Sequence, residues 1–291
     1  MKVEEKEKIK LDAKIYAISS KRDQTYAGGS SKTLYKIEGQ EKTGIYTFSK
    51  SVSSIDIKGE YLAASSFDST ACIFYKQEFL EKIEGPETEI KCIKFSEKNN
   101  FVALSTRGKT VWVCKNTHNN LFEIESILDD HVQDVKGVKF NGTRMYSYGY
   151  DNCVKVYDTL KSIDDSFSLI ESLDFKFTVW DILFLEDCFL VFAENGFVHK
   201  VSFDFNIIKE ERISMFPIYR ATKIDENIFG FIYNLNSICF MNKEFEIEFI
   251  LKDCGLGINC IDFNKETQEL FIGDDSGYLK VFRVFLDKNI Q

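Results

Sequence analysis

Proline and histidine are scarce in this sequence. The 291 residues include only two prolines and three histidines. Proline lacks the backbone N–H that a β-ladder uses, so a chain with this little proline can form strands almost throughout. With three histidines, few acid–base centres or imidazole metal sites can be built. The scarcity of proline therefore favours a strand-rich chain, and the scarcity of histidine leaves few ways to build a catalytic or metal site.

Long apolar runs are also missing. No run approaches the roughly twenty apolar residues that a membrane helix needs, and the longest is interrupted by Glu186, Asp187 and Glu194. The first twenty residues are rich in both acidic and basic residues, whereas a secretory signal has a basic segment followed by an apolar one. We therefore expect a cytosolic or nuclear protein with no membrane partner.

The eight cysteines lack the spacing of a metal or iron–sulfur site. No two are arranged as C-x-x-C, and most fall singly within strand patterns. Three or four thiolates would have to converge on one point to hold a metal or a cluster. The sequence predicts buried thiols and no cofactor or metal at the following cysteines: Cys72, Cys92, Cys114, Cys153, Cys188, Cys239, Cys254 and Cys260.

A basic surface and catalytic motifs are not evident either. The formal net charge is -9, which argues against a face that binds phosphates of nucleic acid directly. The sequence contains no H-E-x-x-H motif, no nucleophile elbow and no glycine-rich loop between a strand and a helix. These absences predict a protein that is not an enzyme.

What the chain does contain is a repeat. Its clearest copy is YLAASSFDSTACIFYK, Tyr61 to Lys76. A period of roughly forty residues is that of a four-stranded propeller blade, and one such blade cannot bury its own apolar face. The sequence predicts an all-β, seven-bladed propeller that spans 1–291 as one domain, with copies beginning near Lys14, Val52, Glu89, Asp134, Thr178, Pro217 and Gly257.

The fourth copy shows the anatomy of a blade. Its alternating run Val135 to Phe140 predicts the innermost strand, and Met145 to Tyr150 predicts the second. A turn at Asp151 leads to the third strand, Val154 to Tyr157.

The last copy supplies only three strands, so a fourth must come from elsewhere. We expect Glu5 to Leu11 to form the outer strand of the last blade, so that both ends of the chain close the ring. For Met1 to Glu5 a solvated charged tail is an equally good interpretation.

One histidine has a specific structural role in this scheme. In propeller repeats a histidine before the innermost strand, a serine, a turn aspartate and a closing aromatic residue form one buried hydrogen-bonded chain. Such a network must be satisfied throughout, so it is more often architecture than active site. Here we expect it to consist of His131, Ser147, Asp151 and Tyr157.

The central third of the chain resembles a known family. After the copy at Tyr61, the segments EGPETEIKCIKF, VALSTRGKTVWV, DDHVQDVKGVKF, YDNCVKVYD and FTVWDILF follow one another. Their order and spacing are similar to those of the WD-repeat subunit of the cytosolic iron–sulfur protein assembly (CIA) targeting complex. The resemblance implies a non-catalytic scaffold that works with a small acidic adaptor and a large helical-repeat subunit. Its clients would be apo iron–sulfur proteins of cytosol and nucleus, which receive [4Fe-4S] clusters.

Partner-binding residues are expected at one end of the ring. Loops that enter the innermost strands and turns between the second and third strands open on that end. Arg107 matches the arginine of the family's S-R-D-K-S-V-W motif, which the resemblance implicates in partner contacts, whereas a solvated rim charge is the structural alternative. For Trp180 the alternative is packing between blades. The candidate set is Arg107, Phe67, Tyr150, Gln133, Asp134 and Trp180.

Two other functions stay open from the sequence. One is a generic WD-repeat adaptor, such as a ubiquitin-ligase receptor or a histone-binding protein. The other is a propeller enzyme such as a lactonase or glycosidase, which needs carboxylates that point into the central channel and often a metal.

Overall fold

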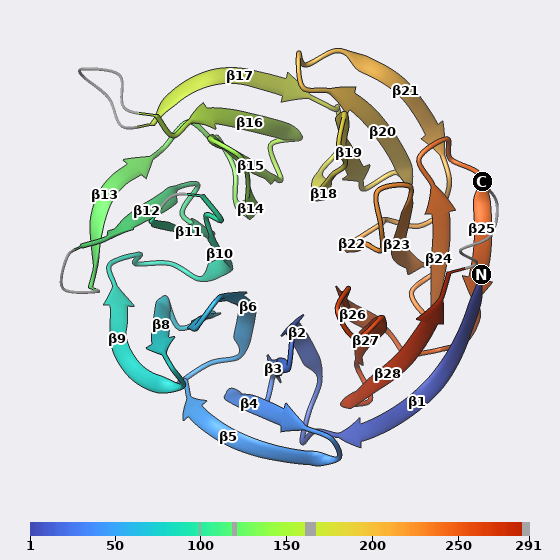
Figure 1. Cartoon of the computed structure of the whole chain (residues 1–291). Coiled ribbons are helices and arrows are strands. Elements are labelled where there is room, and N and C mark those ends of the chain that lie inside the picture. Colours follow the sequence, from blue (N-terminus) through green and yellow to red (C-terminus); the bar gives the residue numbers. More distant parts are fainter. Residues whose placement is uncertain (99, 118–120, 161–166, 287–291) are drawn as a thin grey trace.

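The computed structural model describes residues 1–98, 100–117, 121–160 and 167–286. Over this part of the chain the regular structure consists of strands, which form seven four-stranded antiparallel sheets arranged as a ring (Figure 1). The predicted all-β, seven-bladed propeller is confirmed. Within the same residues no helix has the length and apolar character required to cross a membrane.

The blades follow one another along the chain, and in each the strand order runs from the axis outward. Blade 1 comprises β2 (Ile15–Lys21), β3 (Gln24–Gly29), β4 (Thr33–Glu38) and β5 (Glu41–Thr47). Blade 2 comprises β6 (Val52–Lys58), β7 (Tyr61–Ser66), β8 (Thr70–Tyr75) and β9 (Glu78–Glu84). Blade 3 comprises β10 (Ile90–Phe95), β11 (Phe101–Thr106), β12 (Val111–Asn116) and β13 (Phe122–Leu128). Blade 4 comprises β14 (Val135–Asn141), β15 (Arg144–Gly149), β16 (Cys153–Asp158) and β17 (Ser168–Asp174).

The second half of the ring repeats this order. Blade 5 comprises β18 (Val179–Phe184), β19 (Cys188–Ala193), β20 (Phe197–Ser202) and β21 (Ile207–Arg212). Blade 6 comprises β22 (Ala221–Lys223), β23 (Ile228–Tyr233), β24 (Ser237–Asn242) and β25 (Ile247–Leu251). Blade 7 comprises β26 (Ile258–Asn264), β27 (Glu269–Asp274), β28 (Tyr278–Phe285) and the N-terminal β1 (Lys2–Lys10).

Burial explains why the strands of one blade differ in composition. Second strands such as β11 and β19 are buried along their whole length and are apolar or small-residue runs, as expected for strands covered on both faces. Outer strands such as β21 are mostly exposed and carry charged residues. The core lies between adjacent blades: Met145 and Tyr157 of blade 4, for example, belong to one buried cluster with Val111 and Val113 of blade 3.

The N-terminal strand closes the ring. In Figure 1 β1 lies along the outside of β28, with which it pairs from Lys2↔Phe285 to Lys10↔Tyr278. The predicted closing strand is therefore confirmed, and the solvated-tail alternative is wrong for Lys2 to Glu5. Apolar and polar residues alternate poorly in Lys2 to Glu5, yet β28 offers these residues a free row of N–H and C=O groups. Further along β1, Ile9 is buried among residues of blades 7 and 1.

Candidate functional site

A β-bulge recurs at the start of the innermost strand in every blade except blade 6. The pairing with the second strand skips one residue at each of these places. A bulge leaves its extra residue out of the ladder and can redirect that side chain. All the skipped residues line one cavity at the end of the ring: Tyr16, Ser53, Lys91, Lys136, Trp180 and Asn259.

This cavity, which we call the axial mouth, has a volume of about 670 Å³. Besides the bulge residues it is lined by turn residues between second and third strands and by the segments that enter blades 2, 6 and 7. These further lining residues are Ser51, Phe67, Tyr150, Tyr219, Arg220, Leu235, Gly257, Ile258 and Asp275. A cavity of this size with apolar walls and a few polar groups has the general form of a binding site.

Aromatic side chains form two groups in the axial mouth. Trp180 packs edge-to-face against Tyr150 of blade 4 at 5.5 Å and against Tyr219 at 4.7 Å between ring centroids. On the other side Tyr16 and Phe67 lie 6.5 Å apart, and the Lys91 ammonium lies 5.0 Å from the centre of the Phe67 ring. These side chains pack between blades and also line the cavity.

The structure brings some of the six candidate partner-binding residues together and separates others. Phe67, Tyr150 and Trp180 all line the axial mouth. Trp180 also packs between blades, which was its structural alternative.

The other three candidates lie outside the axial mouth. Arg107 is 61% exposed, and its guanidinium lies 3.6 Å from a Glu89 oxygen and 3.9 Å from an Asp134 oxygen. Gln133 is exposed next to Asp134 on the loop that enters blade 4. Arg107 occupies the same turn position as Phe67 and Tyr150, because its N–H donates to the carbonyl of the residue that precedes the innermost strand.

Among the residues of the axial mouth that sequence reasoning missed are its three cations and one aromatic residue: Lys91, Lys136, Arg220 and Tyr219. A signal was present for the two lysines, which occupy the second position of an innermost strand in the segments EIK and DVK. Reading that position in every repeat would have found them together with Trp180. Tyr219 and Arg220 precede the short strand β22, whose repeat pattern is too weak to align.

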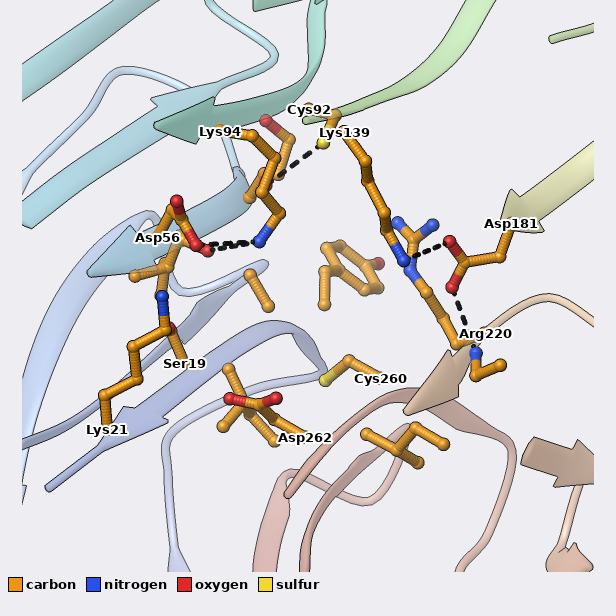
Figure 2. A pocket seen from close by; sticks show the side chains of 18 of the residues that line it. Ser19, Lys21, Asp56, Cys92, Lys94, Lys139, Asp181, Arg220, Cys260 and Asp262 are labelled. Carbon is orange, nitrogen blue, oxygen red and sulfur yellow. Dashed lines mark hydrogen bonds and ion pairs between the residues drawn. The ribbon is translucent and has the colours of Figure 1, made fainter. Parts of the chain in front are cut away.

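A second cavity of about 210 Å³ lies deeper on the axis (Figure 2). Three carboxylates in it join neighbouring blades by accepting a backbone N–H from the next blade. Asp262 accepts from Ser20 at 2.7 Å, Asp56 from Phe95 at 2.9 Å, and Asp181 from Ala221 at 3.0 Å. The carboxylates that a propeller enzyme would need are thus present in the channel, and each is committed to holding two blades together.

The pKa shifts of these three aspartates differ in direction. Burial alone would raise the pKa of Asp181, but the charges of Lys139 and Arg220 and the hydrogen bonds that it accepts lower it below the ordinary value. Asp56 has a lowered pKa because Lys94, whose ammonium lies 3.1 Å away, and Lys21 outweigh burial. For Asp262 burial prevails and the pKa is raised.

The expected network of blade 4 is assembled around His131. Its Nδ1 lies 2.8 Å from Asp151 Oδ2, and its Nε2 lies 2.6 Å from Ser147 Oγ. Tyr157, the fourth expected member, donates its hydroxyl hydrogen to Asp130 at 3.1 Å, a partner that the sequence had not suggested. His131, Ser147 and Tyr157 are buried in the blade, away from both axial cavities.

The cysteines are free thiols, and all are buried except Cys153, which is partly exposed. Burial raises the pKa of Cys72 and Cys188 to about 11 and that of Cys114, Cys239 and Cys254 to about 12. Among the described residues no group of three or more His, Cys, Asp and Glu side chains is placed to hold a metal ion.

Comparison with known proteins supports the family resemblance over part of the chain. No protein-family model matches. The chain is 40% identical over 58 residues to the probable cytosolic iron-sulfur protein assembly protein CIAO1 homolog of Caenorhabditis elegans, which is 19% of this chain and 17% of that protein. It is 41% identical over 64 residues to the probable cytosolic iron-sulfur protein assembly protein 1 of Kluyveromyces lactis, 18% of this chain and 19% of that one.

A third relative is matched over more residues. The probable cytosolic iron-sulfur protein assembly protein 1 of Sclerotinia sclerotiorum is 32% identical over 85 residues, which cover 26% of this chain and 19% of that protein. The chain thus spans about a fifth of the length of the curated relatives that it matches.

Among solved structures, the WD40 β-propeller domain of Doa1 superposes with a TM-score of 0.84 over 98% of this chain and 97% of that one. At 12% identity this likeness shows the fold alone. The resemblance inferred from the motifs is confirmed over this part of the chain: the protein is a β-propeller that is locally similar to the cytosolic iron–sulfur protein assembly proteins.

Proposed function

We propose that this protein is a non-catalytic docking scaffold of cytosolic iron–sulfur protein assembly. It would hold an acidic adaptor and a large helical-repeat subunit, and present apo client proteins of the cytosol and nucleus for insertion of [4Fe-4S] clusters. The observation that carries the proposal is the local identity of 32–41% to relatives that are named for this process.

The architecture is compatible with a docking role. A rigid ring that presents loops from successive blades on one end offers a continuous surface to other proteins. Here that end carries the exposed Arg107 beside an aromatic cavity, which is the kind of composition found in binding hot spots. The buried thiols, with their raised pKa values, suit a scaffold that does not itself carry the cluster.

Partner contacts would centre on the rim between blades 3 and 4. The Arg107 guanidinium lies at long distances from Glu89 and Asp134, and such exposed pairs contribute only about 0–1 kcal/mol. A partner carboxylate can therefore replace them at little cost. Gln133 precedes Asp134 in the chain, and the Tyr150 N–H donates to the Asp134 carbonyl at 3.0 Å, so both lie beside this rim.

Native co-purification tests the proposal. The tagged protein is expressed in its own cytosol at native level, and the proteins retained with it are identified by mass spectrometry, with a tagged unrelated propeller as the control. We expect an acidic adaptor, a helical-repeat subunit and apo iron–sulfur proteins. Recovery of a ubiquitin ligase or of histones in their place would overturn the assignment and favour a generic WD-repeat adaptor.

A further inference from the structure

Two cations in the axial mouth make no direct ion pair. Within the described residues neither the Lys136 ammonium nor the Arg220 guanidinium has a hydrogen-bond acceptor or a carboxylate within ion-pair distance. Lys91, which lines the same cavity, differs in this respect because its Nζ lies 2.7 Å from Glu89 Oε2. The Lys136 ammonium rests instead over the ring of Trp180, 4.7 Å from its centroid.

The carboxylates near the axial mouth are already engaged. Glu194 accepts a hydrogen bond from the indole N–H of Trp180. Asp275 accepts from Lys14 at 2.8 Å and from Asn259 at 2.9 Å. Below the cavity Asp181 is paired with Lys139 at 2.7 Å. The described part of the chain therefore offers Lys136 no carboxylate within ion-pair distance. Arg220 has only the nearby charge of Asp181, which Lys139 already contacts.

This arrangement has an electrostatic cost that a bound anion would relieve. Burial, together with the charges of Arg220 and Lys91, lowers the pKa of Lys136 to about 7, against weaker opposing effects of Cys92 and Asp181. An oxyanion placed between two such cations makes charge-assisted hydrogen bonds, which are about twice as strong as neutral ones.

The surroundings of the axial mouth are apolar as well as cationic. Large apolar side chains are exposed on the loops that enter blades 4 to 7, on the same end of the ring: Val132 at 70%, Phe177 at 45%, Met215 at 76%, Phe216 at 47% and Leu256 at 68%. Exposed apolar side chains on the loops of this end are available for contact with a bound protein segment. A small free anion would leave these side chains uncovered, whereas a peptide segment would cover them.

We infer that the axial mouth binds an anionic side chain on an extended, otherwise apolar segment of a partner protein. The oxyanion is a carboxylate that lies between Lys136 and Arg220, and its apolar neighbours pack on the rings of Trp180, Tyr150 and Phe67. This inference rests on the proposed docking role and names the chemistry that the docking face recognises.

Capped peptides test the inference directly on the purified chain. The probe is an acetylated and amidated heptapeptide with one glutamate between leucines, and its twins carry glutamine or phosphoserine in place of glutamate. We expect the glutamate peptide to bind about tenfold more tightly than the glutamine peptide, in fluorescence anisotropy or NMR titration. Tighter binding of the phosphoserine twin than of the glutamate peptide would overturn the assignment of a carboxylate.

A pH series separates a direct contact from a structural role. Raising the pH from 6 to 8 removes the proton of Lys136, so the affinity for the glutamate peptide should fall about tenfold. Lys136→Gln should lose most of the affinity at pH 6 and should flatten this pH dependence. Lys252→Gln removes the same charge from an exposed loop on the same end, outside the axial mouth, and should behave like the wild type.

Several outcomes would overturn the inference. They are equal binding of the glutamate and glutamine peptides up to millimolar concentration, an unchanged pH profile in folded Lys136→Gln, and equally tight binding of free acetate or phosphate, which would indicate a small-anion site. A negative peptide result with a normal set of co-purified assembly partners refutes this inference alone. Loss of those partners from the wild type refutes the proposed function.

Discussion

The Asp181 carboxylate lies 2.7 Å from the Lys139 ammonium, so an ion pair on the ring axis joins blade 5 to blade 4. The same carboxylate accepts hydrogen bonds from the Tyr148 hydroxyl at 3.0 Å and from the Ala221 N–H at 3.0 Å. One side chain thus fastens three successive blades, and Figure 2 shows it beside Lys139 and Arg220. Removing its charge should affect the ring as a whole.

Asp181→Asn should lower the free energy of unfolding at pH 7 by about 2–4 kcal/mol, because Lys139 loses its ion-pair partner and Arg220 loses the nearby charge of Asp181. The measurement is urea denaturation. Glu226→Gln, which breaks the exposed pair with Lys223, is the matched control and should cost at most about 1 kcal/mol. Equal effects of the two substitutions would show that the axial pair is not structural.

Asp262→Asn should change the free energy of unfolding in the opposite direction. Burial raises the pKa of Asp262 in the fold, so ionising it costs stability as the pH rises from the unfolded pKa through the folded one. Asparagine keeps an acceptor for the Ser20 N–H and carries no charge. We expect a variant at least as stable as the wild type at pH 7, with its advantage vanishing on acidification below the unfolded pKa. A loss of stability at pH 7 would contradict this.

Asp181 should respond to acid in the other direction. Its folded pKa is lowered, so its stabilising contribution is present above the unfolded pKa and is lost as the pH falls through the folded value. The difference in unfolding free energy between wild type and Asp181→Asn should therefore shrink on acidification.

His131→Ala should destabilise the protein by about 2–4 kcal/mol, because it leaves the buried Asp151 and Ser147 without their shared partner. Thermal unfolding followed by circular dichroism measures the effect. Val132→Ala, at the exposed neighbouring position, should change stability by less than about 0.5 kcal/mol. If the His131 variant is as stable as this control, the network does not stabilise the fold.

Ile9→Ala tests the closure of the ring. Ile9 is 4% exposed and packs beside blade 7, so its truncation should cost about 2–4 kcal/mol. The control is Ile207→Ala on the outer strand of blade 5, where the side chain is 51% exposed. If the two variants have the same denaturation midpoint, β1 is not a stabilising part of the last blade.

Arg107→Glu should weaken co-purification with the acidic adaptor and client proteins by tenfold or more, through charge reversal at the rim. The thermal midpoint should be unchanged because the side chain is 61% exposed. Lys109→Glu, two residues along the same turn and also exposed, controls for the change in net charge. Undiminished recovery of partners with Arg107→Glu would place the interface elsewhere.

The sequence by itself determined the ring. Seven copies of a strand-and-turn pattern, each unable to bury its apolar face alone, require stacking of neighbours. The three strands of the last copy require a fourth, and the N-terminal segment was the available one. The network of His131, Ser147 and Asp151 was also predictable, because its members lie within one repeat.

Only the tertiary structure decided what gathers at the axis. Lys136, Trp180 and Arg220 belong to different blades, and their convergence depends on ring geometry and on bulges that no alternating pattern reveals. The same holds for the pairs Asp181–Lys139 and Asp56–Lys94. A repeat specifies the contacts within one sheet, whereas the partner of an axial side chain is set by the neighbouring blade, so charge pairing and cavity chemistry come from the assembled ring.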